Sequence, residues 1–176
     1  NLFKTEGLAK NYTLEMMGFK SSIMEIPSSD INLKIVENYT MNRDFPSLNG
    51  TSKLGIHLRF GTIGIRELAR QILSINETFL NELIWRDFYT QILFNFPHVE
   101  KNSFRPNYDL IKWRNNIDDF ERWKIGNTGF PLVDAGMREL NATGFMHNRV
   151  RMLTASFLTK NLLIDWRWGE RYFAEK

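Results

Sequence analysis

One stretch decides the fold: Met146-His147-Asn148-Arg149-Val150-Arg151-Met152, which leads through residues 153–164 into Asp165-Trp166. Read as a helix with 3.6 residues per turn, it places apolar side chains on one face and polar side chains beside a small residue on the other. An amide, a guanidinium and a thioether beside an alanine suit a flat, polar, redox-active ring or the edge of a base. An ordinary amphipathic helix, with its polar face exposed to solvent, explains the same pattern. The apolar stripe consists of Met146, Val150, Leu153 and Phe157, and the opposite face of Asn148, Arg151, Met152 and Ala155.

The composition is that of a globular chain. Its 176 residues are enough for one core, and 43% of them are hydrophobic, so we expect one domain. The sequence contains no cysteine, and His57, His98 and His147 are widely spaced, which excludes a thiolate zinc site and argues against any metal site. No apolar run approaches the roughly 20 residues that a membrane span requires, so we expect a soluble, cytoplasmic protein without a membrane partner.

Charge and aromatic content permit a nucleic-acid partner. The net charge is +3 and the calculated pI is near 9.2, values that allow binding to DNA without arguing strongly for it. Aromatic residues make up 14% of the chain, including five Trp and fourteen Phe. Most of these rings belong in a core, and their excess leaves some for stacking or for redox chemistry.

The spacing of apolar residues predicts an all-α chain, without a β-hairpin signature or an internal repeat. Residues 1–30 lack a sustained period and are expected to form a linker or an irregular lead-in. We expect a helix from Ile31 to about Tyr39 with Asp30 as its N-cap, and a short helix capped by Thr51 that ends at Leu58. Further helices are predicted at residues 65–73, 78–94, 118–123 and 131–140 and around residues 146–157, with breaks at residues 43–46, at Pro97, at residues 126–129 and at Gly144.

The predicted helix over residues 78–94 has a second polar and aromatic face. Glu82, Trp85, Arg86 and Tyr89 recur there at helical spacing. A Glu four residues before an Arg is the favourable order for an ion pair within a helix, which is a purely structural explanation. The functional alternative is that Trp85 stacks on a base, Arg86 reaches an anion and Glu82 hydrogen-bonds a neutral polar edge.

The segment Thr51-Ser52-Lys53-Leu54-Gly55 indicates a phosphate site. It opens a predicted helix with two hydroxyls, a cation and free backbone N–H groups, which together favour phosphate. Simple helix capping explains the hydroxyls equally well. The segment is not a Walker motif, because the glycine-rich spacing is absent.

These segments together resemble one family. Photolyases and cryptochromes share Arg-Asp-Phe-Pro before Thr-Ser-(Arg/Lys)-Leu, then Glu-Leu-Ile-Trp-Arg, then Thr-Gly-(Tyr/Phe)-Pro-(Ile/Leu)-Val-Asp-Ala, and finally Met-His-Asn-Arg with Asp-Trp downstream. Over residues 37–176 the chain is similar to the flavin-binding helical domain of this family, and most of all to bacterial photolyases that act on cyclobutane pyrimidine dimers. The matching segments occur in the same order: Arg43–Pro46, Thr51–Leu54, Glu82–Arg86, Thr128–Ala135 and Met146–Trp166.

The resemblance implies a role for each matching position. Trp113 and Trp166 would pass electrons to photoexcited flavin, whereas Trp123 and Trp168 match no such position and are expected in the core. Glu82, Trp85, Asn148 and Met152 would contact the lesion or the flavin. FAD would contact Tyr39, Thr51, Ser52, Lys53, Leu54, Gly55, Phe79, Glu82, Arg86, Asn148 and Arg151, and DNA would contact Glu82, Trp85, Arg86, Tyr89, Asn148, Arg149 and Met152.

The chain also departs from the family. Gly55 replaces a serine of the phosphate motif, and Asn161 stands where many photolyases have an aspartate that pairs with the arginine matching Arg151. The chain ends before the segment that encloses the flavin ring, and the N-terminal antenna domain, with its folate or deazaflavin chromophore, has no counterpart. We therefore expect a fragment of a longer, monomeric enzyme, without bound FAD on its own. Residues 1–30 would be a lead-in from the antenna domain, and residues 31–176 an incomplete, C-terminally truncated domain for FAD and DNA.

The implied function of the parent protein is light-driven repair of damaged DNA. Reduced FAD would donate an electron to a flipped-out cyclobutane pyrimidine dimer. Asn148 and Met152 favour this lesion over the six-four photoproduct, whose photolyases carry a His pair in that region. One alternative is a cryptochrome, a blue-light receptor without repair activity. Another, for the fragment as it stands, is a flavin-free helical module that binds DNA or protein.

Overall fold

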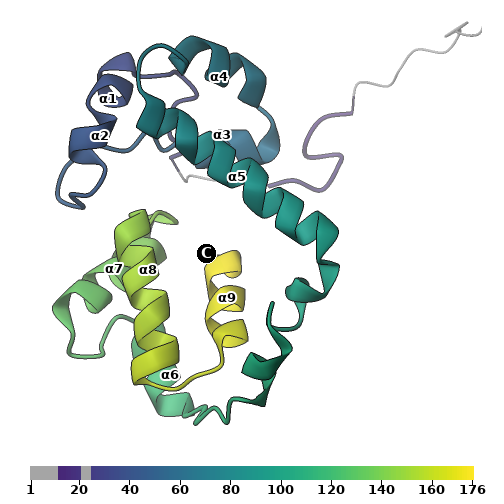
Figure 1. Ribbon diagram of the computed structural model, residues 1–176, viewed down its shortest axis with the longest axis vertical. Helices are drawn as coiled ribbons and strands as arrows, with labels where there is room; N and C mark the ends of the chain where they lie inside the picture. Colours follow the sequence, from purple (N-terminus) through teal and green to yellow (C-terminus); the bar gives the residue numbers. More distant parts are fainter. Residues whose placement is uncertain (1–11, 21–24) are drawn as a thin grey trace, which may run out of the picture.

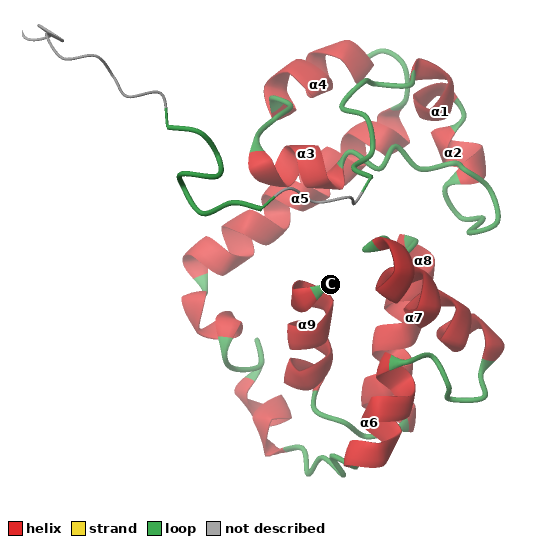
Figure 2. Cartoon of the chain, turned by 180° about the vertical axis from the view of Figure 1, so that it is seen from behind, coloured by secondary structure: helices red, strands yellow, loops and turns green. Residues whose placement is uncertain are grey.

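Helices joined by loops make up the computed structural model, which describes residues 12–20 and 25–176. These ranges contain no strand (Figure 2), so the all-α prediction is confirmed for them. The elements are α1 (Leu33–Glu37), α2 (Tyr39–Asn42), α3 (Gly55–Phe60), α4 (Ile65–Ile72), α5 (Glu77–Asn95), the 3₁₀ helices η1 (Pro97–Glu100) and η2 (Pro106–Leu110), α6 (Ile117–Lys124), α7 (Pro131–Thr143), α8 (Asn148–Ser156), the π-helix η3 (Phe157–Asn161) and α9 (Trp166–Glu175).

The helices form two groups. In Figure 1, helices α1–α5 gather at the top and α6–α9 lie below, and the chain passes between them through the far end of α5, η1 and η2. Each group encloses its own cluster of buried side chains, so the expectation of a single core is wrong for the described residues. The first core contains Val36, Leu54, Leu68, Ile72, Phe79 and Leu83, and the second core contains Trp123, Val133, Met137, Leu140, Met146, Val150, Phe157, Leu158 and Ile164.

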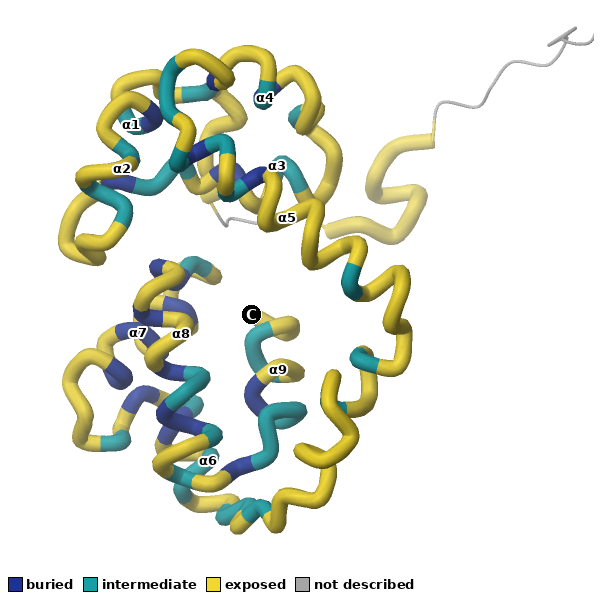
Figure 3. The backbone as a smooth tube through the Cα atoms, viewed as in Figure 1, coloured by how far each residue is buried: buried dark blue, intermediate teal, exposed yellow. Residues whose placement is uncertain are grey.

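The first core is built from side chains one helical turn apart. Leu68 and Ile72 lie on the same side of α4 and are fully buried, which confirms the predicted inward face of that helix. Phe79 and Leu83 have the same relationship on α5. Beyond Leu83 the helix is largely exposed (Figure 3), and several exposed side chains there are apolar or aromatic. The long helix α5 is therefore anchored in the first core mainly by its N-terminal half.

The second core depends on close packing between α7 and α8. A Cβ atom at Gly136 would lie only 2.2 Å from Val150 Cγ1, so the two helix backbones approach more closely than a side chain would permit. Trp123 of α6 is fully buried, and its Nε1 donates a hydrogen bond to the Thr154 carbonyl at 3.1 Å. Trp168 packs against the same core. The assignment of both tryptophans to core packing is confirmed.

The beginning of the first group differs from the sequence prediction. The N-cap of α1 is Asn32, whose side-chain oxygen accepts a hydrogen bond from the Ile35 backbone N–H, and not Asp30. The Asp30 carboxylate instead accepts a hydrogen bond from the Ser28 hydroxyl. The helix also does not continue to Tyr39, because Asn38 leaves the helical conformation and its side-chain amide donates to the Lys34 carbonyl. Two short helices therefore replace the single predicted one.

The predicted start of the next helix is also wrong. Thr51 lies four residues before α3, which begins at Gly55 and has no side-chain cap. Lys53 has a φ of 55°, a left-handed conformation that an α-helix does not tolerate in its interior. The segment from Thr51 to Leu54 is therefore a loop, and its hydroxyls belong to that loop.

Helix α8 is shorter than the stretch that suggested it. It begins at Asn148, because His147 acts as the N-cap and its Nδ1 accepts a hydrogen bond from the Arg149 backbone N–H at 3.2 Å. Met146, Val150 and Phe157 are buried as predicted, but Leu153 is 40% exposed and Thr154 is fully buried instead. From Phe157 the helix widens into η3, a π-helix that the sequence pattern did not indicate.

The described parts of the N-terminal lead-in, residues 12–20 and 25–30, contain turns and bends and no helix, and they are exposed. Residues 1–11 and 21–24 lie outside the described residues. The Pro27 carbonyl lies 2.7 Å from His57 Nε2 of α3, so this segment touches the first group. No helix within the described ranges combines the length and the hydropathy needed to cross a membrane.

Candidate flavin and nucleic-acid site

The predicted functional face of α5 presents an exposed aromatic surface. Trp85 is 53% exposed and Tyr89 is 65% exposed, and their rings stack with centroids 5.9 Å apart and an interplanar angle of 29°. Phe88 meets the Trp85 ring edge-on at 5.4 Å. We call these three residues the aromatic platform. Its rings face solvent and can accept a planar group by stacking.

Glu82 and Arg86 do not form the ion pair that their spacing suggested. The Glu82 carboxylate lies 2.6 Å from Nη1 of Arg43, which follows α2, and Arg86 Nη2 donates to the Leu58 carbonyl of α3 at 3.1 Å. Each side chain thus finds a partner on a different element of the first group. The structural explanation by pairing within the helix is wrong, because partners distant in the sequence compete successfully for both groups.

Arg43 and Asp44 continue this contact to the second group. Asp44 Oδ1 accepts a hydrogen bond from Arg149 Nε at 2.8 Å and forms an ion pair with Arg149 Nη2 at 2.6 Å. Arg43 Nε lies 3.5 Å from the same oxygen. The hydrogen bond from Arg149 holds the pKa of the Asp44 carboxyl below its usual value, since it outweighs the opposing effect of desolvation. Glu82, Arg43, Asp44 and Arg149 therefore form a chain of alternating charges from α5 to α8, which we call the charge chain.

Tyr39 and Phe79 lie beside the charge chain. Their rings meet edge to face with centroids 5.0 Å apart, and Arg43 stands over the Tyr39 ring at 5.5 Å. Burial raises the pKa of the Tyr39 hydroxyl, and the negative charge of Glu82 adds to that effect. Phe79 is only 4% exposed and belongs to the first core. Tyr39 is half-buried and is the more accessible of these two predicted cofactor neighbours.

The loop from Thr51 to Gly55 has the chemistry of a phosphate site. Thr51 and Ser52 are half-buried hydroxyls, and a Cβ atom built on Gly55 would meet nothing within 4 Å, so the backbone there can be approached closely. Lys53 Nζ stands 5.1 Å from the centroid of the Phe145 ring in the second group. Two hydroxyls, an open backbone and a cation fit the phosphates of a dinucleotide such as FAD.

The exposed face of α8 carries the remaining predicted contacts. Asn148 Nδ2 lies 3.7 Å from Met152 Sδ, one turn further along, and Met152 is 58% exposed. The Arg151 guanidinium stands over the Phe173 ring of α9 at 5.8 Å, and no carboxylate among the described residues pairs with it. Arg151 still reaches solvent, but the protein around it lowers the pKa of its guanidinium by desolvation. An unpaired cation at this place fits an electron-rich or anionic ligand.

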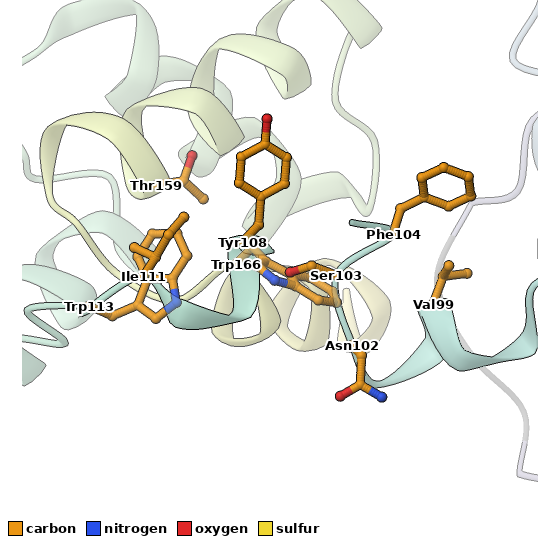
Figure 4. Close-up of a pocket in the computed structure, with 9 residues that line it drawn as sticks. All are labelled: Val99, Asn102, Ser103, Phe104, Tyr108, Ile111, Trp113, Thr159 and Trp166. Atoms are coloured by element: carbon orange, nitrogen blue, oxygen red, sulfur yellow. The ribbon is translucent and has the colours of Figure 1, made fainter. Parts of the chain in front are cut away.

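Trp113 and Trp166 lie at one cavity, although 53 positions separate them in the sequence. Both are half-buried and line a cavity of about 350 Å³ (Figure 4), where the two indoles come from the segment after η2 and from the start of α9. The Arg114 backbone N–H donates to the Leu163 carbonyl at 2.7 Å, and Arg167 Nε donates to the Lys101 carbonyl at 2.7 Å. These bonds hold the two segments together.

Sequence reasoning missed several residues that shape the site. Arg43 and Asp44 belong to the Arg43–Pro46 motif, but no role was predicted for them from the sequence. Their opposite charges were the only feature of the sequence that pointed to an ion-pair contact. Phe145 and Phe173, which meet Lys53 and Arg151, gave no signal beyond their aromaticity. No group of three His, Cys, Asp or Glu side chains able to hold a metal occurs in residues 12–20 and 25–176.

Residues 79–176 match the model of a protein family described as the FAD binding domain of DNA photolyase. The chain belongs to this DNA photolyase family. The family model thus covers nearly all of α5 with its aromatic platform, the two tryptophans at the cavity and the whole second group. The motif segments Arg43–Pro46 and Thr51–Leu54 precede the matched residues.

Known relatives agree with this family. The chain is 49% identical over 146 residues to a deoxyribodipyrimidine photo-lyase of Alkalihalophilus pseudofirmus, a match that covers 80% of this chain and 30% of the relative. It is similar to the crystal structure of an archaeal photolyase from Sulfolobus tokodaii with two FAD molecules, with a TM-score of 0.74, 48% identity and coverage of 82% and 32% of the two chains. It is also similar to a cryptochrome from Synechocystis, with a TM-score of 0.73, 35% identity and coverage of 80% and 31%. The chain spans about a third of the length of the relatives it matches.

Proposed function

We propose that the protein that carries this chain repairs cyclobutane pyrimidine dimers in DNA with the energy of light. The names of its relatives support this proposal, and one structural observation carries it: Trp85 and Tyr89 form an exposed stacking surface one turn from the Glu82 carboxylate. Enzymes that act on a base inside a duplex, photolyases among them, flip that base out, and a damaged base costs less to unstack. The platform offers a stacking face for such a base, and a carboxylate nearby can accept hydrogen bonds from its polar edge.

The chain would contribute one wall of an FAD site. Thr51, Ser52 and the open backbone at Gly55 would hold the phosphates, while Arg151 and Asn148 of α8 would face the flavin. Bound reduced FAD supplies an electron after it absorbs blue or near-ultraviolet light. The protein's part is to place the cofactor close to the lesion and to exclude water from the space between them.

Trp113 and Trp166 would serve a second purpose, which is to return oxidised flavin to its reduced state. Two half-buried indoles at one cavity, held by hydrogen bonds between their segments, form a suitable path from the surface toward a cofactor. Repair itself would not consume these electrons. The two activities can therefore be separated by substitution, because only photoreduction needs the tryptophan pair.

The remaining properties are proposed on the resemblance. The protein would act as a soluble, cytoplasmic monomer and would collect additional light with an antenna chromophore, such as a folate or a deazaflavin, outside residues 31–176. Size-exclusion chromatography of the purified protein tests the monomeric state, and its absorption spectrum tests the antenna chromophore. A second peak absent from free FAD would support an antenna chromophore.

Binding to damaged DNA tests the repair proposal. Trp85→Ala should weaken binding to a duplex with one dimer much more than binding to the undamaged duplex, because only the flipped lesion stacks on the platform. The loss should be on the order of 1–3 kcal/mol. Phe94→Ala is the matched control, since Phe94 is a 79% exposed ring on the same helix away from the platform. Equal weakening of both duplexes would reject the role of Trp85.

A cryptochrome without repair activity is the second candidate, favoured by the structural similarity to the Synechocystis protein. The sequence identity to the photolyases is higher, at 48% and 49%. Illumination of a dimer-containing oligonucleotide with the reduced protein separates the two functions. Loss of the dimer supports a photolyase, and an unchanged dimer with bound, photoactive FAD supports a receptor.

A further inference from the structure

We propose that Asp44 is a positioning residue that orients Arg149 so that the free end of its guanidinium meets a phosphate of bound DNA. The inference deepens the proposed function and rests on it, since it requires DNA as the ligand of this surface. Asp44 would not touch the DNA itself, and it would act entirely through Arg149.

The hydrogen bonds of Arg149 determine which part of it stays free. Its guanidinium carries five N–H donors. Nε donates one hydrogen bond to Asp44 Oδ1 at 2.8 Å, and Nη2 forms an ion pair with the same oxygen at 2.6 Å. The outer edge of the guanidinium, formed by Nη1 and the outer N–H of Nη2, donates no hydrogen bond to any described residue. These donors form the end-on fork that binds two phosphate oxygens at once.

The pair is accessible to a ligand as large as DNA. The Arg149 side chain is 48% exposed and the Asp44 side chain 51% exposed. Arg149 lies one turn before Met152 on α8, and Met152 is also exposed. Both residues follow the N-cap of the helix. A phosphate can therefore approach the free fork from solvent without displacing Asp44.

Asp44 is itself held in place. Arg43 Nε lies 3.5 Å from Asp44 Oδ1, while Arg43 Nη1 binds Glu82 of α5 at 2.6 Å. The charge chain thus fixes Asp44 between two arginines, one from each group of helices. Its carboxyl is charged at neutral pH, and the hydrogen bond from Arg149 lowers its pKa further. An arginine oriented in this way loses less rotamer freedom when it binds a phosphate than a free one does.

The proposal predicts an effect opposite in sign to simple electrostatics. A carboxylate close to a DNA-binding arginine repels phosphate, so its removal should strengthen binding if charge were its only contribution. If Asp44 orients Arg149, its removal should weaken binding. Because phosphate contacts carry no sequence or lesion information, the weakening should be the same for damaged and undamaged duplexes.

Four variants test the proposal in the protein that carries this chain. Asp44→Asn should raise the Kd for both duplexes by about 3- to 10-fold. Asp44→Glu should restore part of the affinity, because a carboxylate still meets Arg149. Arg149→Met should weaken binding further, and Asp44→Asn should have no added effect in that background. Asp87→Asn is the control, since it removes an exposed carboxylate of α5 that forms no ion pair among the described residues, and it should leave binding unchanged or slightly tighter.

The outcomes separate failure of this inference from failure of the proposed function. Unchanged or tighter binding by Asp44→Asn, together with weaker binding by Arg149→Met, would overturn the positioning role and leave the DNA function intact. Normal binding by Arg149→Met would overturn the inference at its premise. A wild-type protein that fails to distinguish dimer-containing from undamaged DNA would contradict the proposed function. Because Asp44 is exposed, Asp44→Asn should fold normally, which its circular dichroism spectrum checks.

Discussion

Arg167 Nη2 donates a hydrogen bond to Asp109 Oδ1 at 2.7 Å, although the two residues lie 58 positions apart in the sequence. The same carboxylate accepts hydrogen bonds from the Ser103 backbone N–H and hydroxyl, and these bonds and Arg167 hold the pKa of Asp109 below its usual value. The contact fastens the segment around η2 to the start of α9. Trp113 follows the first segment and Trp166 begins the second, so this contact joins the parts of the chain that carry them.

Arg167→Gln should therefore slow photoreduction of oxidised flavin, because the η2 segment would be held less firmly against α9. Binding to dimer-containing DNA in the dark should stay unchanged. Arg171→Gln, which removes an exposed arginine one turn further along α9, is the control. The rate of photoreduction is measured by illuminating the oxidised protein and following the flavin absorbance over time. A rate equal to that of the wild type would show that the Arg167–Asp109 contact does not position the pair.

Replacement of Trp166 by Phe should slow photoreduction of oxidised flavin while leaving repair by already reduced protein nearly intact. Phenylalanine keeps most of the packing at the cavity, but it is a far poorer electron donor than tryptophan. Trp168→Phe is the matched control, because Trp168 packs against Phe120 in the second core and has no proposed redox role. Unchanged photoreduction by the Trp166 variant would remove this residue from the electron path.

Gly136→Ala should destabilise the chain by about 1–3 kcal/mol, because the new methyl group would overlap Val150 Cγ1 and push α7 away from α8. Urea unfolding measures the change in the free energy of unfolding. Gly64→Ala is the control, since its Cβ would meet only the Glu67 Cβ at an ordinary 3.8 Å. The double variant Gly136→Ala, Val150→Ala should not show the full sum of the two single losses. Strict additivity would mean that the two sites do not clash.

Asp134 should make stability depend on pH in the acid range. Its buried carboxylate accepts hydrogen bonds from the Thr128 hydroxyl, the Thr128 N–H and the Gly129 N–H, at 2.6, 2.8 and 3.0 Å. Desolvation raises its pKa, but these bonds outweigh that effect and hold the pKa below its ordinary value of 3.8. The folded state therefore binds this proton less readily than the unfolded state. The stabilisation is complete above pH 3.8 and is lost as the pH falls through the folded pKa.

The variant Asp134→Asn tests this. It should lose about 2 kcal/mol at neutral pH, because an amide N–H₂ faces the donors of the turn. Its stability should also fall less steeply in acid than that of the wild type. Asp118→Asn, which alters an exposed carboxylate at the start of α6, should leave both quantities nearly unchanged. Parallel acid unfolding curves for Asp134→Asn and the wild type would contradict the assignment.

The 176-residue chain on its own should retain little FAD. Cofactor sites bury roughly 70–90% of their ligand, whereas Gly55, Arg151 and Met152 are exposed in this structure. A surface of this kind lacks the enclosure and preorganisation that tight binding requires. Chain mixed with FAD and passed over a desalting column should emerge colourless, with free FAD on the same column as the control. Stoichiometric flavin absorbance in the protein fraction would disprove the expectation.

Local sequence patterns predicted the elements of this fold better than its contacts. The inward residues Leu68 and Ile72, the proline that starts α7 and the buried Val150 all follow from periodicity and capping. Glu82 shows where such reasoning stops, because its partner Arg43 lies 39 positions away and only the folded chain brings them together. The left-handed Lys53 likewise depends on the loop around it, and no propensity of lysine indicates that conformation.

The roles of the motif residues remain predictions. Periodicity placed Trp85, Asn148 and Met152 on exposed faces, where the structure has them. It did not reveal that Asp44 joins the two groups, because that contact spans 105 positions. Contacts between distant segments follow from tertiary packing, which a single sequence does not display.

The two separate cores should let this chain open as two cooperative units. Val36, Leu68 and Ile72 belong to one cluster, and Trp123, Met137 and Ile164 belong to the other, so we expect each unit to lose its packing without opening the other. Amide hydrogens of α4 and of α7 should therefore exchange with solvent through different opening events and with different free energies. A lesion-sized ligand that contacts both Trp85 and Met152 would couple the opening of the two groups of helices. Bound damaged DNA should then slow amide exchange in both groups together.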